Sequence, residues 1–224
     1  IEAAVAQHLT DLSHAGEHDV VFENAQARER TQILFNHANQ VGGIVVGTGD
    51  LSELALGWAT FNADQMANYN VNASVPKTLM AYLVRWYAQH RAQTDLAVVL
   101  QAVLDTPISP ELIPPKNSEI SQRTEDLMGP YELHDFFLFH WLRFGASPTK
   151  IFALACLSFQ DQYSGEVIQH WLAQFFRRFM TQQFKRTTLP PGPKVGSVSL
   201  SPRGDWRMPD EAEFTHLVAE VESL

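Results

Sequence analysis

The fold of this chain is decided by the stretch Gly43-Ile44-Val45-Val46-Gly47-Thr48-Gly49-Asp50-Leu51. Its apolar run, Ile44 to Val46, is bounded by glycines, as expected of a buried parallel strand, and it leads directly into a Gly-Thr-Gly turn and a helix. Glycines in such a turn let backbone N–H groups approach a phosphate at the helix N-terminus without a Cβ in the way. The stretch therefore predicts an α/β fold with an anion site where the strand ends.

The helices and loops around this stretch form a regular pattern. Upstream, we expect a helix around residues 4–12, a short extended piece at residues 20–22, and a helix over about residues 25–40 that Asn24 caps and Gly42 ends. Downstream, the amide-rich segment 62–72 reads as a loop, after which Ser74 caps a helix that Pro76 opens and that runs to about residue 89.

The second half of the chain reads as helical. We expect a helix over residues 96–104, a loop over residues 107–129, and helices over residues 132–144, 148–160, 166–184 and 210–224. These helices carry many aromatic side chains, for which a hydrophobic core is the favoured interpretation. The alternative is an oligomer interface on the helices between residues 131 and 184. The aromatic residues in question are Phe136, Phe137, Phe139, Trp141, Phe144, Trp171, Phe175, Phe176 and Phe179.

Composition indicates a soluble globular chain. Its 224 residues, 45% hydrophobic and 18% charged, suffice for one sizeable core. No apolar run approaches the roughly 20 residues of a membrane span, and the first residues resemble no signal peptide, so we expect a cytoplasmic protein with no membrane partner. The single cysteine, Cys156, is expected to be a small buried hydrophobe in preference to a nucleophile. The nine histidines show no metal-ligand spacing, so no metal site is predicted.

Charge is unevenly distributed along the chain. The net charge of −9 argues against a nucleic-acid partner, yet residues 177–207 hold seven of the sixteen basic side chains and only one acidic side chain, Asp205. A basic stretch in an acidic protein fits a compact anionic ligand better than a polymer. A solvated basic loop is an equal alternative.

Several long strings of residues occur in an order and spacing typical of one enzyme family, and they cover nearly the whole chain. They lie at residues 22–28, 43–58, 69–78, 184–186, 192–195 and 201–207. Together they resemble the synthetase domain of glutamine-dependent NAD synthetases. The resemblance implies an incomplete Rossmann-like ATP-pyrophosphatase domain, of the adenine nucleotide alpha-hydrolase-like kind, with few parallel strands here and a mainly helical C-terminal half.

The resemblance also implies a reaction, the ATP-dependent amidation of deamido-NAD to NAD. The nicotinate carboxylate is adenylated, pyrophosphate leaves, and ammonia displaces AMP. Charge that develops on the phosphate oxygens calls for Mg²⁺, backbone N–H groups and cationic side chains. The implied ligands are therefore ATP with Mg²⁺, deamido-NAD and ammonia, the ammonia coming from glutamine through a glutaminase domain of the same polypeptide, and we expect a homo-oligomer.

Eight residues of this chain match functional positions of the family. Thr48 matches a contact to ATP, with a simple turn threonine as the alternative. For Asn24 and Glu53 the alternatives are helix capping, since Asp50-x-x-Glu53 also reads as a capping box. For Trp58 and Phe61 the alternative is packing. The positions that match contacts to deamido-NAD are Asn24, Glu53, Trp58, Ala59, Thr60, Phe61 and Lys185.

Two parts of the family pattern do not occur in these 224 residues. The S-G-G-x-D-S loop that wraps the ATP pyrophosphate is absent, and Cys156 does not match the cysteine of the glutaminase domain. We therefore expect residues 1–224 to be the C-terminal portion of one synthetase domain and to be inactive alone. The remaining alternatives are a non-catalytic helical interaction module and another ATP-pyrophosphatase amidoligase, such as a GMP synthetase.

Overall fold

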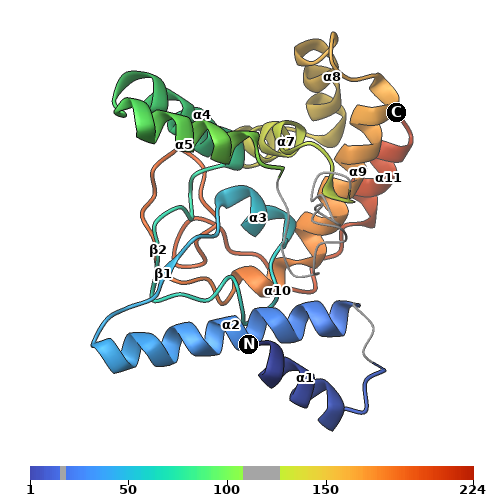
Figure 1. The fold of residues 1–224 in the computed structure, drawn as a ribbon. Helices are drawn as coiled ribbons and strands as arrows, with labels where there is room; N and C mark the ends of the chain where they lie inside the picture. The colour runs from blue at the N-terminus through green and yellow to red at the C-terminus, as the bar shows by residue number, and fades with distance from the viewer. Residues whose placement is uncertain (16–18, 108–126) are drawn as a thin grey trace.

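The computed structural model describes residues 1–15, 19–107 and 127–224, and in these ranges the chain is mostly helical (Figure 1). None of the described helices is long and apolar enough to cross a membrane. The helices are α1 (Glu2–Asp11), α2 (Val20–Val41), α3 (Leu51–Leu56), α4 (Lys77–His90), α5 (Thr94–Asp105), α7 (Tyr131–Phe144), α8 (Pro148–Ser158), α9 (Gly165–Thr181), α10 (Gln183–Arg186) and α11 (Thr215–Glu222), and the strands are β1 (Val46–Gly47) and β2 (Tyr69–Asn70).

The described sheet is a single parallel pair. β1 lies beside β2 with Val46 opposite Tyr69 and Gly47 opposite Asn70. The parallel direction was predicted, but the expected burial was wrong, because Ile44 is 64% exposed and Val46 is 53% exposed. An apolar run is buried only where other elements cover it, and β2 is the one described strand beside β1. The partner strand comes from the amide-rich segment, which was expected to be loop throughout.

The hydrophobic core is formed by α7, α8, α9 and α11, with α3 packed against α7 and α9 (Figure 1). Phe137, Phe175, Phe176 and Phe179 are fully buried, and their rings meet at centroid distances such as 5.9 Å and 5.4 Å. The core interpretation is confirmed for these residues, so they cannot form an interface. It is wrong for two aromatic residues on the outer side of α7, Phe139 and Phe144, which are 41% and 62% exposed.

Cys156 is half-buried and packs against this core. Desolvation at this place raises the pKa of its thiol. A thiol nucleophile needs a lowered pKa, so the interpretation as a small packing residue is the better one.

Helix α2 begins earlier than expected and forms a hairpin with α1 (Figure 1). Asp19 is its N-cap, and its carboxylate accepts hydrogen bonds from the backbone N–H groups of Val21 and Phe22. The extended piece at residues 20–22 and the capping role of Asn24 are therefore both wrong. Two β-branched residues favour a strand only weakly, and a capping carboxylate overrides that preference. The predicted helix end at Gly42, in the left-handed region at φ 66°, is confirmed.

Helices α4 and α5 form a second hairpin, at the upper left of Figure 1. Ser74 does not cap α4. Its hydroxyl instead donates to the Pro193 carbonyl at 3.0 Å and accepts from the Val195 N–H at 2.6 Å. The N-terminus of α4 is held by Asp135 of α7, which accepts from the Thr78 N–H at 3.1 Å. The predicted capping at Ser74 was wrong because a distant segment uses the hydroxyl.

The ends of the C-terminal helices agree more closely with the prediction. Gly145 ends α7 in the left-handed region, and the Ser147 hydroxyl caps α8, both as expected. The helix predicted over residues 166–184 is divided into α9 and α10, and the closing helix α11 begins at Thr215, not at residue 210. The loop predicted over residues 107–129 and the turn predicted at Gly16 fall mainly or wholly outside the described residues.

Candidate functional site

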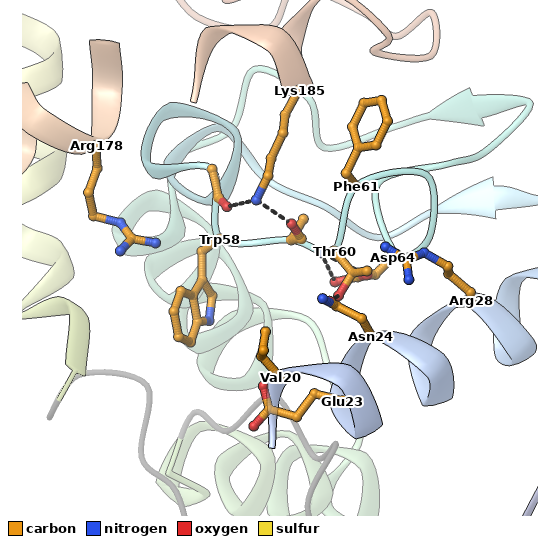
Figure 2. A pocket seen from close by; sticks show the side chains of 12 residues that line it. Val20, Glu23, Asn24, Arg28, Trp58, Thr60, Phe61, Asp64, Arg178 and Lys185 are labelled. Atoms are coloured by element: carbon orange, nitrogen blue, oxygen red, sulfur yellow. Dashed lines mark hydrogen bonds between the residues drawn. The ribbon is translucent and has the colours of Figure 1, made fainter. Parts of the chain in front are cut away.

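A cleft of about 310 Å³ lies between the N-terminal half of α2, the turn after α3, and the adjoining parts of α9 and α10 (Figure 2). It brings together six of the seven residues predicted to contact deamido-NAD. Glu53 is the predicted residue that does not line it. The lining residues are Val20, Glu23, Asn24, Arg28, Gly57, Trp58, Ala59, Thr60, Phe61, Asp64, Arg178 and Lys185.

The floor of the cleft is the turn of residues 57–61. Gly57 ends α3 at φ 63°, and a Cβ placed on it would come within 2.4 Å of the Gln182 side chain, so only glycine fits. Lys185 of α10 donates from Nζ to the Gly57 carbonyl at 2.7 Å and to the Ala59 carbonyl at 2.8 Å, as the dashed lines of Figure 2 show. The lysine thus fixes the shape of the turn while keeping one N–H for a ligand.

Further hydrogen bonds join Thr60 of this turn to α2 and to Asp64. The Thr60 hydroxyl donates to the side-chain carbonyl of Asn24 at 2.9 Å. The Thr60 N–H donates to both carboxylate oxygens of Asp64, at 3.0 Å and 3.1 Å. Phe61 packs against Phe184 with ring centroids 5.3 Å apart, so packing accounts for part of its role. The Asn24 side chain therefore holds Thr60 in place and does not cap a helix.

One wall of the cleft is cationic and aromatic. The guanidinium carbon of Arg178 lies 5.4 Å from the centroid of the Trp58 ring, and its Nε donates to the Leu56 carbonyl at 3.1 Å. Desolvation lowers the pKa of Arg178, and desolvation and then Arg178 itself lower the pKa of Lys185. A cleft with two neighbouring, partly desolvated cations favours an anionic ligand.

Sequence reasoning did not single out Arg28 as a cleft residue, and it included Arg178 only as one member of the basic stretch 177–207. A signal for Arg28 exists in the sequence, since residues 20, 24 and 28 are four apart and share one helix face. Placing the start of the helix at residue 25 hid that signal. Arg178 comes from α9 and meets the turn only through the packing of α9 on α3, which no local pattern reveals.

Glu53 and Thr48 lie at the other end of α3, outside the cleft lining. Glu53 and Asp50 form the capping box that the sequence offered as an alternative, with N–H to carboxylate distances of 2.9 Å and 3.1 Å. Lys77 joins both carboxylates, with Nζ 2.7 Å from Asp50 Oδ2 and 2.6 Å from Glu53 Oε1. Thr48 is exposed at the end of β1.

Charged neighbours alter the pKa values of Glu53 and Lys77. Desolvation and then the nearby Asp50 carboxylate raise the pKa of Glu53, and Lys77 opposes that rise. Desolvation of Lys77 works to lower its pKa, but the two carboxylates outweigh it, and its pKa is raised. A charged Lys77 thus stands between two carboxylates.

Within the described residues, no group of three or more His, Cys, Asp or Glu side chains could hold a metal ion by itself. Mg²⁺ in nucleotide sites commonly uses one or two protein carboxylates, with phosphate and water completing the shell. Both oxygens of the Glu53 carboxylate are already engaged, Oε1 by Lys77 Nζ at 2.6 Å and Oε2 by the Asp50 N–H at 3.1 Å. A cation at Glu53 would therefore have to displace Lys77, and the described residues form no metal site of their own.

Comparison with known proteins decides the family. The sequence model of the NAD synthase family matches residues 1–180. The chain belongs to the NAD synthase family. It is 48% identical over 225 residues to the glutamine-dependent NAD(+) synthetase of Mycobacterium leprae (strain TN), covering 92% of this chain and 33% of that protein.

A second NAD synthase relative gives the same picture. The glutamine-dependent NAD(+) synthetase of Mycobacterium bovis (strain ATCC BAA-935 / AF2122/97) is 50% identical over 214 residues, which are 87% of this chain and 31% of that protein. The chain thus spans about a third of the length of the curated relatives it matches.

The solved structures contain a matching fold. The crystal structure of a glutamine-dependent NAD(+) synthetase from Cytophaga hutchinsonii aligns with a TM-score of 0.74 at 19% identity and covers 99% of this chain and 34% of that chain. The helices and the parallel strand pair therefore have a counterpart in an NAD synthetase fold.

Proposed function

We propose that this chain takes part in the ATP-dependent amidation of deamido-NAD to NAD, as the C-terminal portion of a synthetase domain. The observation that carries the proposal is the convergence of the residues matched to dinucleotide contacts. Asn24, the turn of residues 58–61 and Lys185 come from three distant segments and line one cleft. A chance resemblance in sequence gives no reason for such residues to meet.

The cleft suits a dinucleotide with a pyridine carboxylate. Trp58 and Phe61 offer aromatic faces for stacking, and the third N–H of Lys185 is free to take an oxyanion in the part of the chain that the structure describes. Thr60 is fixed by Asn24 and Asp64, so its position does not depend on the ligand. The chain thus orients deamido-NAD by a preformed turn.

We propose that ATP binds at the opposite end of α3. Thr48 is exposed at the end of β1, in a turn before α3 of the kind that binds a phosphate. The nearby Glu53 carboxylate would hold Mg²⁺ once the cation had displaced Lys77 from it. Bound Mg²⁺ would neutralise charge on the phosphates during adenylation. The family's phosphate-wrapping loop does not occur in residues 1–224, so a domain of the Rossmann-like ATP-pyrophosphatase kind would be completed by further chain, and residues 1–224 alone should be inactive.

Ammonia would come from glutamine through a glutaminase domain of the same polypeptide, in the cytoplasm. We also propose a homo-oligomer, because the α4–α5 hairpin exposes a row of large apolar side chains that a second copy could cover. Light scattering from the intact protein would show a multiple of the protomer mass if this is right, and the protomer mass alone if it is wrong. The exposed side chains are Leu79, Tyr82, Leu83, Trp86, Tyr87, Leu96, Val98, Val99 and Val103.

The function is tested by incubating the intact protein, meaning the full polypeptide that contains residues 1–224, with deamido-NAD, Mg²⁺-ATP and glutamine. We expect NAD, AMP and pyrophosphate in equal amounts, and ammonium chloride should replace glutamine. Amidation of xanthosine monophosphate in place of deamido-NAD would indicate another amidoligase. If neither nitrogen source gives NAD, the proposed function is wrong.

A further inference from the structure

Arg178 is a cation in the cleft wall whose surroundings suit the binding of an anion. It lies on α9, half-buried, with its guanidinium over Trp58 and facing the cavity opposite α2 (Figure 2). The only hydrogen bond of its side chain within the described residues runs from Nε to the Leu56 carbonyl. This bond fixes the side chain by one edge and leaves its terminal nitrogens toward the cleft.

A structural explanation for such a cation exists, because the C-terminus of a helix attracts positive charge. Three basic side chains gather at the end of α3, and they differ in how much of their bonding capacity the protein uses. Arg186 is only 1% exposed and donates from Nε, Nη1 and Nη2 to Gln183 and to three carbonyls. Lys185 uses two of its three donors, and Arg178 uses one of its five. Arg186 is thus fully used in holding the helix end, whereas Arg178 and Lys185 each bond carbonyls there and keep donors unused.

No acidic side chain neutralises Arg178 among the described residues. Arg178 forms no ion pair in the part of the chain that the structure describes. The carboxylate of Asp64 accepts hydrogen bonds from the Thr60 N–H on the other side of the turn. Burial lowers the pKa of Arg178, and burial and then the neighbouring Arg178 lower the pKa of Lys185, with Asp64 opposing that shift. A planar guanidinium with free terminal nitrogens is the side chain best shaped for a carboxylate or phosphate.

We propose that Arg178 is a specificity-determining residue that binds an oxyanion of the dinucleotide together with Lys185, while Trp58 holds the guanidinium in position. This inference rests on the proposed function. The oxyanion is either the pyridine carboxylate or the pyrophosphate, which offer the same oxygen acceptors. The two differ in one consequence: the carboxylate is present in deamido-NAD and absent from NAD, whereas both carry the pyrophosphate.

The test measures the dissociation constants of deamido-NAD and of NAD by isothermal titration calorimetry on the intact protein and its variants Arg178→Gln and Arg178→Lys. Loss of one charged hydrogen-bond pair should weaken binding about tenfold to a hundredfold in Arg178→Gln, with a smaller loss in Arg178→Lys, which keeps the charge but not the planar fork. A loss confined to deamido-NAD assigns Arg178 to the carboxylate. An equal loss for both ligands assigns it to the pyrophosphate.

Arg177→Gln is the matched control. Arg177 is the neighbouring residue of α9, and it pairs with Glu222 of α11, away from the cleft. Its replacement should leave both dissociation constants unchanged. The thermal unfolding midpoint of Arg178→Lys should equal that of the wild type, which shows that the variant is folded. Folded Arg178 variants that bind both ligands as tightly as the wild type would overturn the inference. Failure of the wild type itself to bind deamido-NAD would instead refute the proposed function.

Discussion

At the residue scale, the preorganisation of the cleft comes from main-chain carbonyls. The carbonyls of Leu56, Gly57 and Ala59 accept hydrogen bonds from Arg178 and Lys185, which lie more than a hundred residues further along the chain. A helix of six residues has a weak tendency to form alone, so cations at its negative end stabilise it and set the direction of the turn that follows. The same bonds therefore hold the fold and shape the site.

His134 is a residue that should make stability depend on pH. It is buried in α7, its Nε2 bonds the Met128 carbonyl at 2.5 Å, and burial lowers its pKa to about 4. In the unfolded chain its pKa is about 6.5, so below that pH the unfolded state takes up a proton that the folded state rejects. The free energy of unfolding should fall by about 3 kcal/mol as the pH is lowered from 6.5 to 4.

Urea unfolding between pH 4 and pH 7 measures this dependence. Other carboxyl groups titrate in the same range, so the informative quantity is the difference between the wild type and His134→Gln. That variant should lose the part of the slope that His134 contributes, although it is less stable at pH 7. Parallel curves for the two proteins would show that His134 does not titrate as described.

At the scale of elements, the loop before residue 200 is fitted against the strand pair. The Asn70 N–H of β2 donates to the Pro191 carbonyl at 2.8 Å. A Cβ on Gly192 would lie 2.2 Å from the Asn70 carbonyl oxygen and 3.0 Å from the Ala73 Cβ. Backbone cannot move aside as a flexible side chain can. Glycine at position 192 is therefore required by close approach, although its φ is ordinary.

Replacing Gly192 with alanine should destabilise the protein. The clash forces the loop away from β2, and overpacking of this kind costs about 1–3 kcal/mol. The thermal unfolding midpoint of Gly192→Ala should drop by several degrees, as measured by circular dichroism. Gly204→Ala is the control, because a Cβ there meets nothing within 4 Å. Equal midpoints for the two variants would contradict the close approach.

Local signals predicted the elements whose ends are decided locally. Gly42, Gly145 and Ser147 mark helix ends because their own conformation or hydroxyl makes the cap. The predicted cap at Ser74 was wrong because its hydroxyl forms hydrogen bonds with a segment about 120 residues away. Burial of the first strand was also mispredicted, since it depends on which elements cover the strand and not on its composition.

At the scale of the whole molecule, the candidate site is only partly readable from the sequence. Six of the eight residues matched by resemblance line one cleft, and Thr48 and Glu53 lie outside it. Glu53 does not join them, because its place in the capping box keeps it at the opposite end of α3. The basic stretch 177–207, which includes Arg178, was matched to an anionic ligand from the sequence, but the contact of Arg178 with the turn could not be predicted, because it depends on the packing of α9 against α3.

The central claim is that this cleft binds the dinucleotide, and the most direct test compares two aromatic variants of the intact protein. Trp58 lines the cleft, whereas Phe144 is 62% exposed at the end of α7, outside the cleft lining and outside the α4–α5 hairpin. Loss of the aromatic ring of Trp58, on which the ligand would stack, should weaken binding of deamido-NAD about tenfold or more in Trp58→Ala, with a smaller loss in Trp58→Phe. Isothermal titration calorimetry should give the wild-type dissociation constant for Phe144→Ala. A folded Trp58→Ala protein that binds deamido-NAD as tightly as the wild type would contradict the account.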